Sequence, residues 1–339
     1  MILPLIVHFN WPFARDAAAY VSGVQSLLAG NDPYVSEIFR AGLFGSLLIF
    51  LIAIVSPAFL ESVIFLSLNI LGMVCFVRYF SNIMYRKKDF YILILISWSS
   101  ASREGLNIIQ IAGIILGLIS VVLRSLDKSP NDSRYSFNFY LGIFCAAILV
   151  DLKPHFVLPL LVIACIKKKK FRFGSMVIAV LISGHSIIDL WAGKFLTLTW
   201  FQLMLSLANK PIDSERQDFT NLWSIAFAFF DLGNFAKVLP YIVIVILTLF
   251  TAFTSLISIE KSIFVGLTLP LLSTYTHYYD YLGLVIMCVV AVAKSNRTKD
   301  LIVITPLLLI AENWQNLQGI FLILMFFLYY FFFLVGAGL

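Results

Sequence analysis

The sequence predicts an all-α protein that crosses a membrane several times. Of its 339 residues, 61% are hydrophobic and only 12% are charged, and the mean hydropathy is +0.96. Apolar runs recur from Ala41 to the C-terminus, and in lipid the backbone polar groups must be paired within helices or closed barrels. We therefore expect residues 1–339 to form one integral membrane domain. It should contain about nine to twelve membrane helices, some short or re-entrant, around a cavity on the external face.

Basic residues are clustered between the apolar runs and account for the net charge of +6. Such clusters mark cytoplasmic loops, because Lys and Arg bias the topology of membrane segments. No soluble basic domain is available to hold a nucleic acid, so the expected partners include membrane lipids and no nucleic acid. The four cysteines lie inside apolar runs without metal-type spacing, which indicates small buried side chains. The clusters are Arg86 to Lys88, Arg124 to Arg134, Lys167 to Arg172, and Lys294 to Lys299.

The first element expected along the chain is a short helix that carries Asp16 and Tyr20 one turn apart, so that a carboxylate and a phenol share one face. Gly30 to Tyr34 reads as the turn that closes it, and Asp32 is assigned to this turn rather than to catalysis. We expect residues 10–40 to form an external loop. If this loop is external, Ala41 to Phe59 must be a re-entrant or interfacial helix, and Ser62 to Phe80 must cross the membrane. The alternative topology places the Asp16 loop in the cytoplasm.

Two short hairpins follow, each between basic clusters and each with a polar tip. One tip contains Arg103 and Glu104, and the other runs from Asp151 to His155. An arm of about 12 to 15 residues rises only about 18 to 23 Å, against a hydrocarbon core of about 30 Å. Both tips should therefore lie below the membrane surface. Charges at that depth require water, a partner or a ligand, which predicts a wet cavity that opens outward.

The second half of the chain continues the alternation. Phe173 to Trp191 reads as one full pass outward, residues 192–238 as an external segment, and Leu239 to Ile259 as the return. A third polar tip, at Tyr275 to Asp280, follows a pass that begins at Ser262. A last hairpin begins at Leu301 and carries Glu312 to Asn316 at its tip. Three or four polar tips thus converge on one face.

The ordered motifs resemble those of GT-C glycosyltransferases, most closely the polyprenol-phosphate-mannose-dependent mannosyltransferases of glycosyltransferase family 87. Asp16, Tyr20 and the segment from Leu28 to Tyr34 are similar to the opening of that family. The pattern covers most of the chain, although the chain lacks the Tyr-Pro-Pro usually found after the first loop. The other matching segments are Arg103 to Gln110, Leu152-Lys153-Pro154 followed by Lys167 to Lys170, Asn221 to Ser224, and Ser273 to His277.

The resemblance implies an inverting transfer of mannose or a related sugar. The donor would be a polyprenyl-phosphate sugar, and the acceptor a hydroxyl of a lipid or glycan. The reaction would take place at the external, periplasmic face of a bacterial inner membrane. An inverting transfer needs a carboxylate to accept the acceptor proton, and Asp16 is the candidate catalytic residue. A helix cap, or a partner of Arg15, is its structural alternative.

Fixed cations would stabilise the leaving phosphate, and Lys153, Arg103 and His155 are the candidates at membrane depth. His277, Tyr20 and Asn221 are the further candidates for substrate binding. The structural alternatives are the ion pairs Asp151 with Lys153 and Glu104 with Arg103, and an interfacial anchor for His277. No cofactor is expected. A divalent metal is not favoured, although Asp16, Asp32 and Glu37 lie close in sequence.

Two other classes of function remain as alternatives. A lipid or glycan transporter or flippase would also place charges in a membrane cavity, but it predicts inverted repeats and charges approaching from both sides. In this chain the unusual polar residues are expected on the external side alone, opposite the basic loops. A non-catalytic membrane subunit is the third class, and the short apolar stretch before Asp16 favours it.

Overall fold

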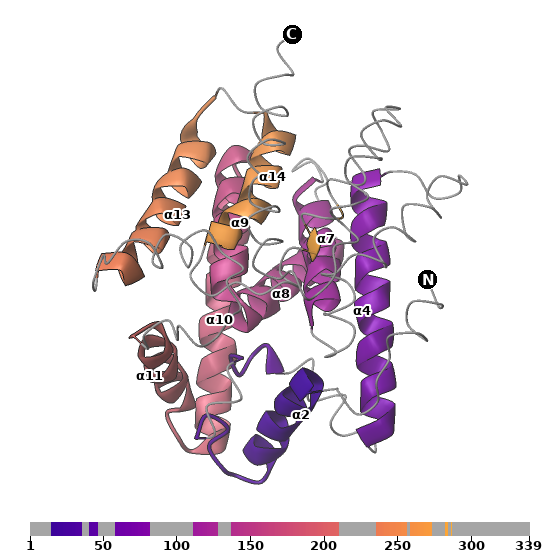
Figure 1. The fold of residues 1–339 in the computed structure, drawn as a ribbon, viewed down its shortest axis with the longest axis vertical. Helices are drawn as coiled ribbons and strands as arrows, with labels where there is room; N and C mark the ends of the chain where they lie inside the picture. The colour runs from indigo at the N-terminus through magenta and orange to yellow at the C-terminus, as the bar shows by residue number, and fades with distance from the viewer. Residues whose placement is uncertain are drawn as a thin grey trace, which may run out of the picture.

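The computed structural model describes residues 15–35, 41–46, 58–81, 111–127, 137–209, 235–255, 258–272, 282–283 and 286. Within these ranges the secondary structure is helical and contains no strand, which confirms the all-α prediction (Figure 1). The helices are α2 (Arg15–Leu28), α4 (Ala58–Ser81), α7 (Ala112–Asp127), α8 (Phe137–Leu152), α9 (Pro154–Lys167), α10 (Phe171–Ala192), α11 (Leu196–Asn209), α13 (Phe235–Phe253), α14 (Ile259–Thr268) and the 3-10 helix η1 (Leu269–Leu272).

Within the described residues, α10 is the one helix long and apolar enough to cross a membrane. Its 22 residues span about 33 Å, against about 30 Å for the hydrocarbon core. The helices α8 and α9 have 16 and 14 residues, or about 24 and 21 Å, and the chain turns between them at Lys153. The chain therefore forms two short helices that meet where the sequence predicts the tip of a hairpin. Large apolar side chains are exposed on α10 and α13, among them Ile178, Ile182, Ile187, Val245, Ile246 and Phe250.

Basic residues gather at one end of the bundle, which we call the basic end and define by Arg78, Arg124, Lys167 and Lys168. The Tyr79 hydroxyl at the end of α4 donates to Asp127 at the end of α7, over 2.7 Å. Lys168 pairs with the same carboxylate, and Lys167 donates to the carbonyl oxygen of Thr254, just after α13. The C-terminal ends of α4, α7, α9 and α13 therefore meet here.

Helices α4 and α7 run parallel and cross closely. Asn69 lies against Gly113, Gly72 lies against Gly117, and Tyr79 bonds Asp127, so residue numbers rise together along the two helices. A Cβ on Gly113 would come within 2.4 Å of the Asn69 carbonyl oxygen, so only glycine allows this approach. Both helices therefore end at the basic end, with Tyr79 and Asp127 in contact there.

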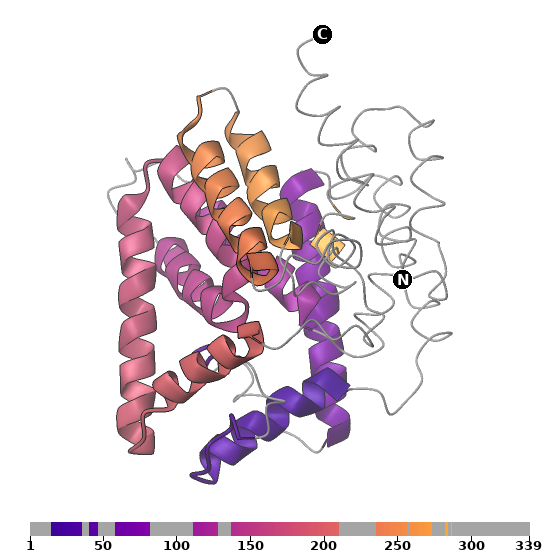
Figure 2. The same ribbon diagram turned by 60° about the vertical axis from the view of Figure 1, so that its left-hand side comes forward.

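The other end of the bundle carries α2 and α11. In Figures 1 and 2 both helices lie across the end of the molecule at which α10 finishes, away from α13 and α14. The segment Ala41–Ser46, predicted to begin a re-entrant helix, is a buried turn through Gly45, and the next described helix starts at Ala58 rather than Ser62. Buried apolar side chains, mostly aliphatic and with Phe65, Phe76 and Phe173 as the largest, form the core.

Candidate functional site

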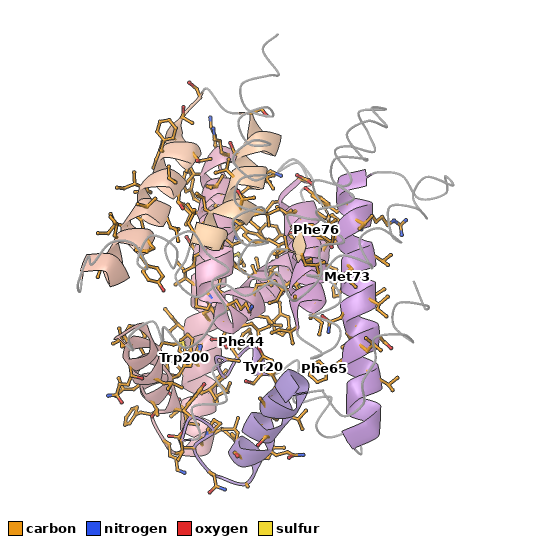
Figure 3. The ribbon with its side chains drawn as sticks, in the orientation of Figure 1. Tyr20, Phe44, Phe65, Met73, Phe76 and Trp200 are labelled. Atoms are coloured by element: carbon orange, nitrogen blue, oxygen red, sulfur yellow. The ribbon has the colours of Figure 1, made fainter. Side chains whose placement is uncertain are left out.

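The structure describes four of the seven predicted site residues. Asp16 and Tyr20 lie on α2, as predicted, and the half-buried Tyr20 packs against the main apolar cluster. Figure 3 shows Tyr20 reaching from α2 toward the side of the bundle that carries Phe44. Lys153 is half-buried at the α8–α9 junction, and His155 lies in the first turn of α9. The remaining three candidates, Arg103, Asn221 and His277, lie outside the described residues.

The predicted turn after α2 is confirmed in detail. Gly30 has a left-handed φ of 77°, which favours glycine, and the backbone N–H of Asn31 donates to the Ser26 carbonyl oxygen at 2.9 Å. Next, the Asp32 carboxylate accepts a hydrogen bond from the backbone N–H of Tyr34 at 2.8 Å, which gives Asp32 the turn role assigned to it. This turn delivers Tyr34 into the interior.

Tyr34 carries a buried hydroxyl group that lies near three carboxylates. It is 3% exposed and donates a hydrogen bond to the Ala41 carbonyl oxygen at 3.1 Å. Burial raises the pKa of Tyr34 well above its usual range, and the nearby charges of Asp151, Asp32 and Asp189 raise it further. Tyr34 therefore stays protonated and acts as a hydrogen-bond donor, which links the turn after α2 to the segment 41–46.

Asp151, at the end of α8, is the most buried carboxylate among the described residues, with 1% exposure. One carboxylate oxygen accepts the backbone N–H of Gly45 at 2.5 Å, and the other lies 2.7 Å from His185 Nε2. Its backbone carbonyl oxygen accepts the N–H of Gly42 at 3.1 Å. A Cβ on Gly42 would lie only 1.9 Å from the carboxylate, so glycine is required where the segment covers Asp151.

His185 joins Asp151 to α11. The residue is 9% exposed, its Nδ1 lies 3.1 Å from the Thr197 hydroxyl, and its ring stacks on Trp200 with the ring centroids 5.7 Å apart. The Asp189 carboxylate accepts the backbone N–H of Thr197 at 3.0 Å, which fixes the first turn of α11. Figure 3 shows Trp200 extending from α11 at this corner.

These contacts define a polar end of the molecule: residues 30–34, 41–46, 151–153 and 185–200. Lys194, between α10 and α11, donates to the Gly30 carbonyl oxygen at 2.5 Å and so closes this end across the chain. Since α10 ends at Ala192, His185 lies about two turns, or roughly 10 Å, inside that end. The Asp151 tip thus lies beside α10, short of the end of that helix.

The structural alternative, an ion pair between Asp151 and Lys153, is corrected by these contacts. Both oxygens of Asp151 are occupied by groups from other parts of the chain, Gly45 and His185. Sequence reasoning missed His185, because the run from Phe173 to Trp191 reads as a plain membrane pass. A signal was present: His185 and Asp189 are two ionisable residues one turn apart inside an apolar helix.

Comparisons of the chain with protein-family models, curated proteins and solved structures find no match. In the part of the chain that the structure describes, no group of three or more His, Cys, Asp or Glu side chains could hold a metal ion. The described polar end itself presents several functional groups. These are a half-buried ammonium group, carboxylates, and a buried imidazole held between a carboxylate and a hydroxyl.

Proposed function

We propose that the protein is a multi-pass membrane glycosyltransferase that moves a sugar, mannose or a related hexose, from a polyprenyl phosphate to an acceptor hydroxyl. The observation that carries the proposal is the grouping of ionisable side chains in an apolar bundle at one end. Lys153 at the α8–α9 junction, the Asp151–His185 pair and the turn that follows the Asp16 helix all belong to this end.

The opposite ends of the bundle suggest the orientation. Arg78, Arg124, Lys167 and Lys168 meet at the basic end, and excess Lys and Arg favour the cytoplasmic side. The polar end then faces outward. This orientation is the reason for placing the reaction at the external face of a bacterial inner membrane, where a polyprenyl donor presents its headgroup.

The proposed reaction uses two candidate residues. The acceptor oxygen attacks the anomeric carbon as the bond between that carbon and the donor phosphate oxygen breaks, which inverts the configuration. Asp16 accepts the proton of the acceptor hydroxyl, and the polyprenyl phosphate leaves with both bonding electrons. Lys153 stabilises the charge that develops on this phosphate. The half-buried position of Lys153 at a short helix junction supports the second role, because a cation at that depth interacts strongly with an anion.

Transfer of a radiolabelled hexose from a polyprenyl phosphate, assayed in proteoliposomes with a hydroxyl-bearing lipid acceptor, tests the proposal. Asp16→Asn should reduce the rate about 100-fold or more, because the side-chain shape is kept and only the base is lost. Asp32→Asn is the matched control, since asparagine can still accept the Tyr34 N–H and the rate should change little. Survival of transfer within a few-fold in Asp16→Asn would return Asp16 to a capping role.

Labelling with a membrane-impermeant thiol reagent tests the orientation. In a background without native cysteines, Asn31→Cys reports on the polar end and Arg124→Cys on the basic end, and both native side chains are exposed. We expect only Asn31→Cys to react from outside the cell. Reaction of Arg124→Cys alone would invert the topology. Movement of the labelled lipid between leaflets without sugar transfer would favour a flippase instead.

A further inference from the structure

We infer that His185 is a positioning residue: through Asp151 it holds the α8–α9 junction, and with it Lys153, at a fixed depth in the bundle. The mechanical part of this inference stands on the contacts of the described residues. Its consequence for donor binding rests on the proposed function, in which Lys153 faces the donor phosphate.

The first step is the attachment of Asp151. The end of α8 receives two backbone N–H groups from the segment 41–46, one at the Asp151 carboxylate and one at its carbonyl oxygen. His185 supplies the third bond, from the long helix α10. Because the carboxylate is almost fully buried, loss of the imidazole would leave one of its oxygens without this partner in an apolar setting.

The second step is the short connection from Asp151 to Lys153. The backbone N–H of Lys153 donates to the Leu149 carbonyl oxygen at 3.0 Å, so Lys153 is still tied to the last turn of α8. Its own carbonyl oxygen accepts the N–H of Val157 at 3.2 Å, and Pro154 begins α9 directly after it. The backbone of Lys153 therefore cannot shift along the bundle unless the end of α8 moves with it.

The third step is that His185 is itself fixed. Thr197 and Trp200 hold the ring from α11, and Asp189 ties the start of α11 back to α10. Next to His185, a Cβ on Gly184 would lie 2.2 Å from the Phe44 ring, so α10 packs tightly on the segment that also bonds Asp151. The imidazole is thus held by α10 and α11, and Asp151 lies between it and the segment 41–46.

The bonding pattern also assigns the proton. A carboxylate only accepts, so His185 Nε2 carries hydrogen and donates to Asp151, while Nδ1 lies within hydrogen-bond distance of the Thr197 hydroxyl. Glutamine at position 185 can present an amide N–H near the place of Nε2, whereas phenylalanine keeps the ring shape without any hydrogen bond. The two substitutions separate the Asp151 bond from simple packing.

The test uses the reactivity of position 153, which needs no substrate. In a cysteine-free background, Lys153→Cys is labelled with a small thiol reagent, alone and combined with His185→Gln or His185→Phe. We expect His185→Phe to raise the labelling rate about tenfold, because the released junction exposes position 153. His185→Gln should restore most of the original rate. Asp151→Asn should shift the rate in the same direction as His185→Phe.

Asn69→Leu is the matched control, because it weakens the α4–α7 crossing without touching Asp151. At an equal loss of thermal stability, Asn69→Leu should leave the labelling of position 153 unchanged. If His185→Phe folds and leaves that rate unchanged, or if Asn69→Leu changes it equally, the positioning role is wrong. If His185→Phe fails to fold, the labelling rates of His185→Gln and Asp151→Asn are compared instead. His185→Gln should keep the original rate and Asp151→Asn should change it, and equal rates would make the positioning role wrong.

Donor binding then tests the functional consequence with polyprenyl phosphate as the probe. We expect His185→Phe to raise its dissociation constant about tenfold or more, as small displacements of an orienting group do, with recovery in His185→Gln. A wild-type protein that binds no polyprenyl phosphate would overturn the proposed function. The labelling result would still decide whether His185 positions Lys153.

Discussion

The α4–α7 crossing and the α8–α10 crossing bury polar side chains by the same device but differ in what those side chains can do. At the first, the amide of Asn69 accepts the backbone N–H groups of Gly113 and Ile114 at 2.9 and 3.3 Å, and donates to the Phe65 carbonyl oxygen at 2.9 Å. At the second, Asp151 accepts the N–H of Gly45 from the segment 41–46 and also meets His185.

We call the α4–α7 crossing the neutral joint and the α8–α10 crossing the ionisable joint, after the side chains that hold them. Asn69 carries no charge, and it satisfies N–H groups at the start of α7 that would otherwise lack partners in an apolar setting. Asp151 and His185 are both ionisable, an arrangement that is costly in an apolar bundle unless each group is paired. Burial of a polar group alone therefore does not identify a functional site. Ionisable groups beside a half-buried lysine are a stronger indication.

Asp151→Ala should have the largest effect on stability. Removal of one member of a buried pair leaves the Gly45 N–H and the His185 ring without their partner, and we expect unfolding to become easier by about 3 to 5 kcal/mol. Thermal unfolding in detergent measures this loss. A double-mutant cycle with His185→Phe should show strong coupling, and additive losses would mean that the two residues act independently.

Gly113→Ala should be nearly as damaging at the neutral joint. The added methyl group would lie 2.4 Å from the Asn69 carbonyl oxygen, a backbone atom that cannot move aside cheaply, so we expect a loss of about 3 kcal/mol. Gly174→Ala is the control, because its Cβ would meet only the Cys165 sulfur at an ordinary 3.6 Å. Equal melting temperatures for the two variants would show that the crossing is looser than described.

Asn69→Leu should cost less, about 2 kcal/mol, since it removes the acceptor of two N–H groups but leaves no charge behind. Chemical or thermal unfolding of this variant beside Asp151→Ala ranks the two joints directly. The comparison would fail if Asn69→Leu proved the more destabilising of the two.

Lys153→Met should have a smaller effect on stability than the preceding variants, because it leaves Asp151 with both Gly45 and His185 as partners. Its effect should appear in the binding of polyprenyl phosphate, which we expect to weaken about tenfold or more through the loss of a cation at depth. Calorimetric binding and melting curves on the same sample measure both. A large stability loss with unchanged donor affinity would make Lys153 structural.

The sequence predicts local elements here better than the contacts between them. The Asp16 helix, its Gly30 turn and the break at Lys153 follow from turn residues and proline, whose effects act within a few positions. The contact between Gly45 and Asp151 joins positions 106 apart, and no spacing rule predicts it. His185 was overlooked for the same reason, since its importance comes from what α8 and α11 place beside it.

Cysteine burial was predicted from the apolar surroundings and is confirmed for Cys145 and Cys165, while Cys75 is partly exposed and Cys288 lies outside the described residues. Position in the bundle decides this difference, because one face of α4 packs on α7 while apolar side chains of α4 also lie on its exposed face. An apolar run with little polar contrast does not indicate which face is covered.

The bond from Lys194 to Gly30 joins residues that leave the ribosome far apart in time. The two positions are 164 residues apart, so at about 5 to 20 residues per second roughly 8 to 30 seconds separate their synthesis. The turn after α2 must wait for α10 and the start of α11 before its carbonyl oxygen meets the lysine. The polar end is therefore completed late in biosynthesis, and a chain halted before residue 194 would carry α2 without this closing contact.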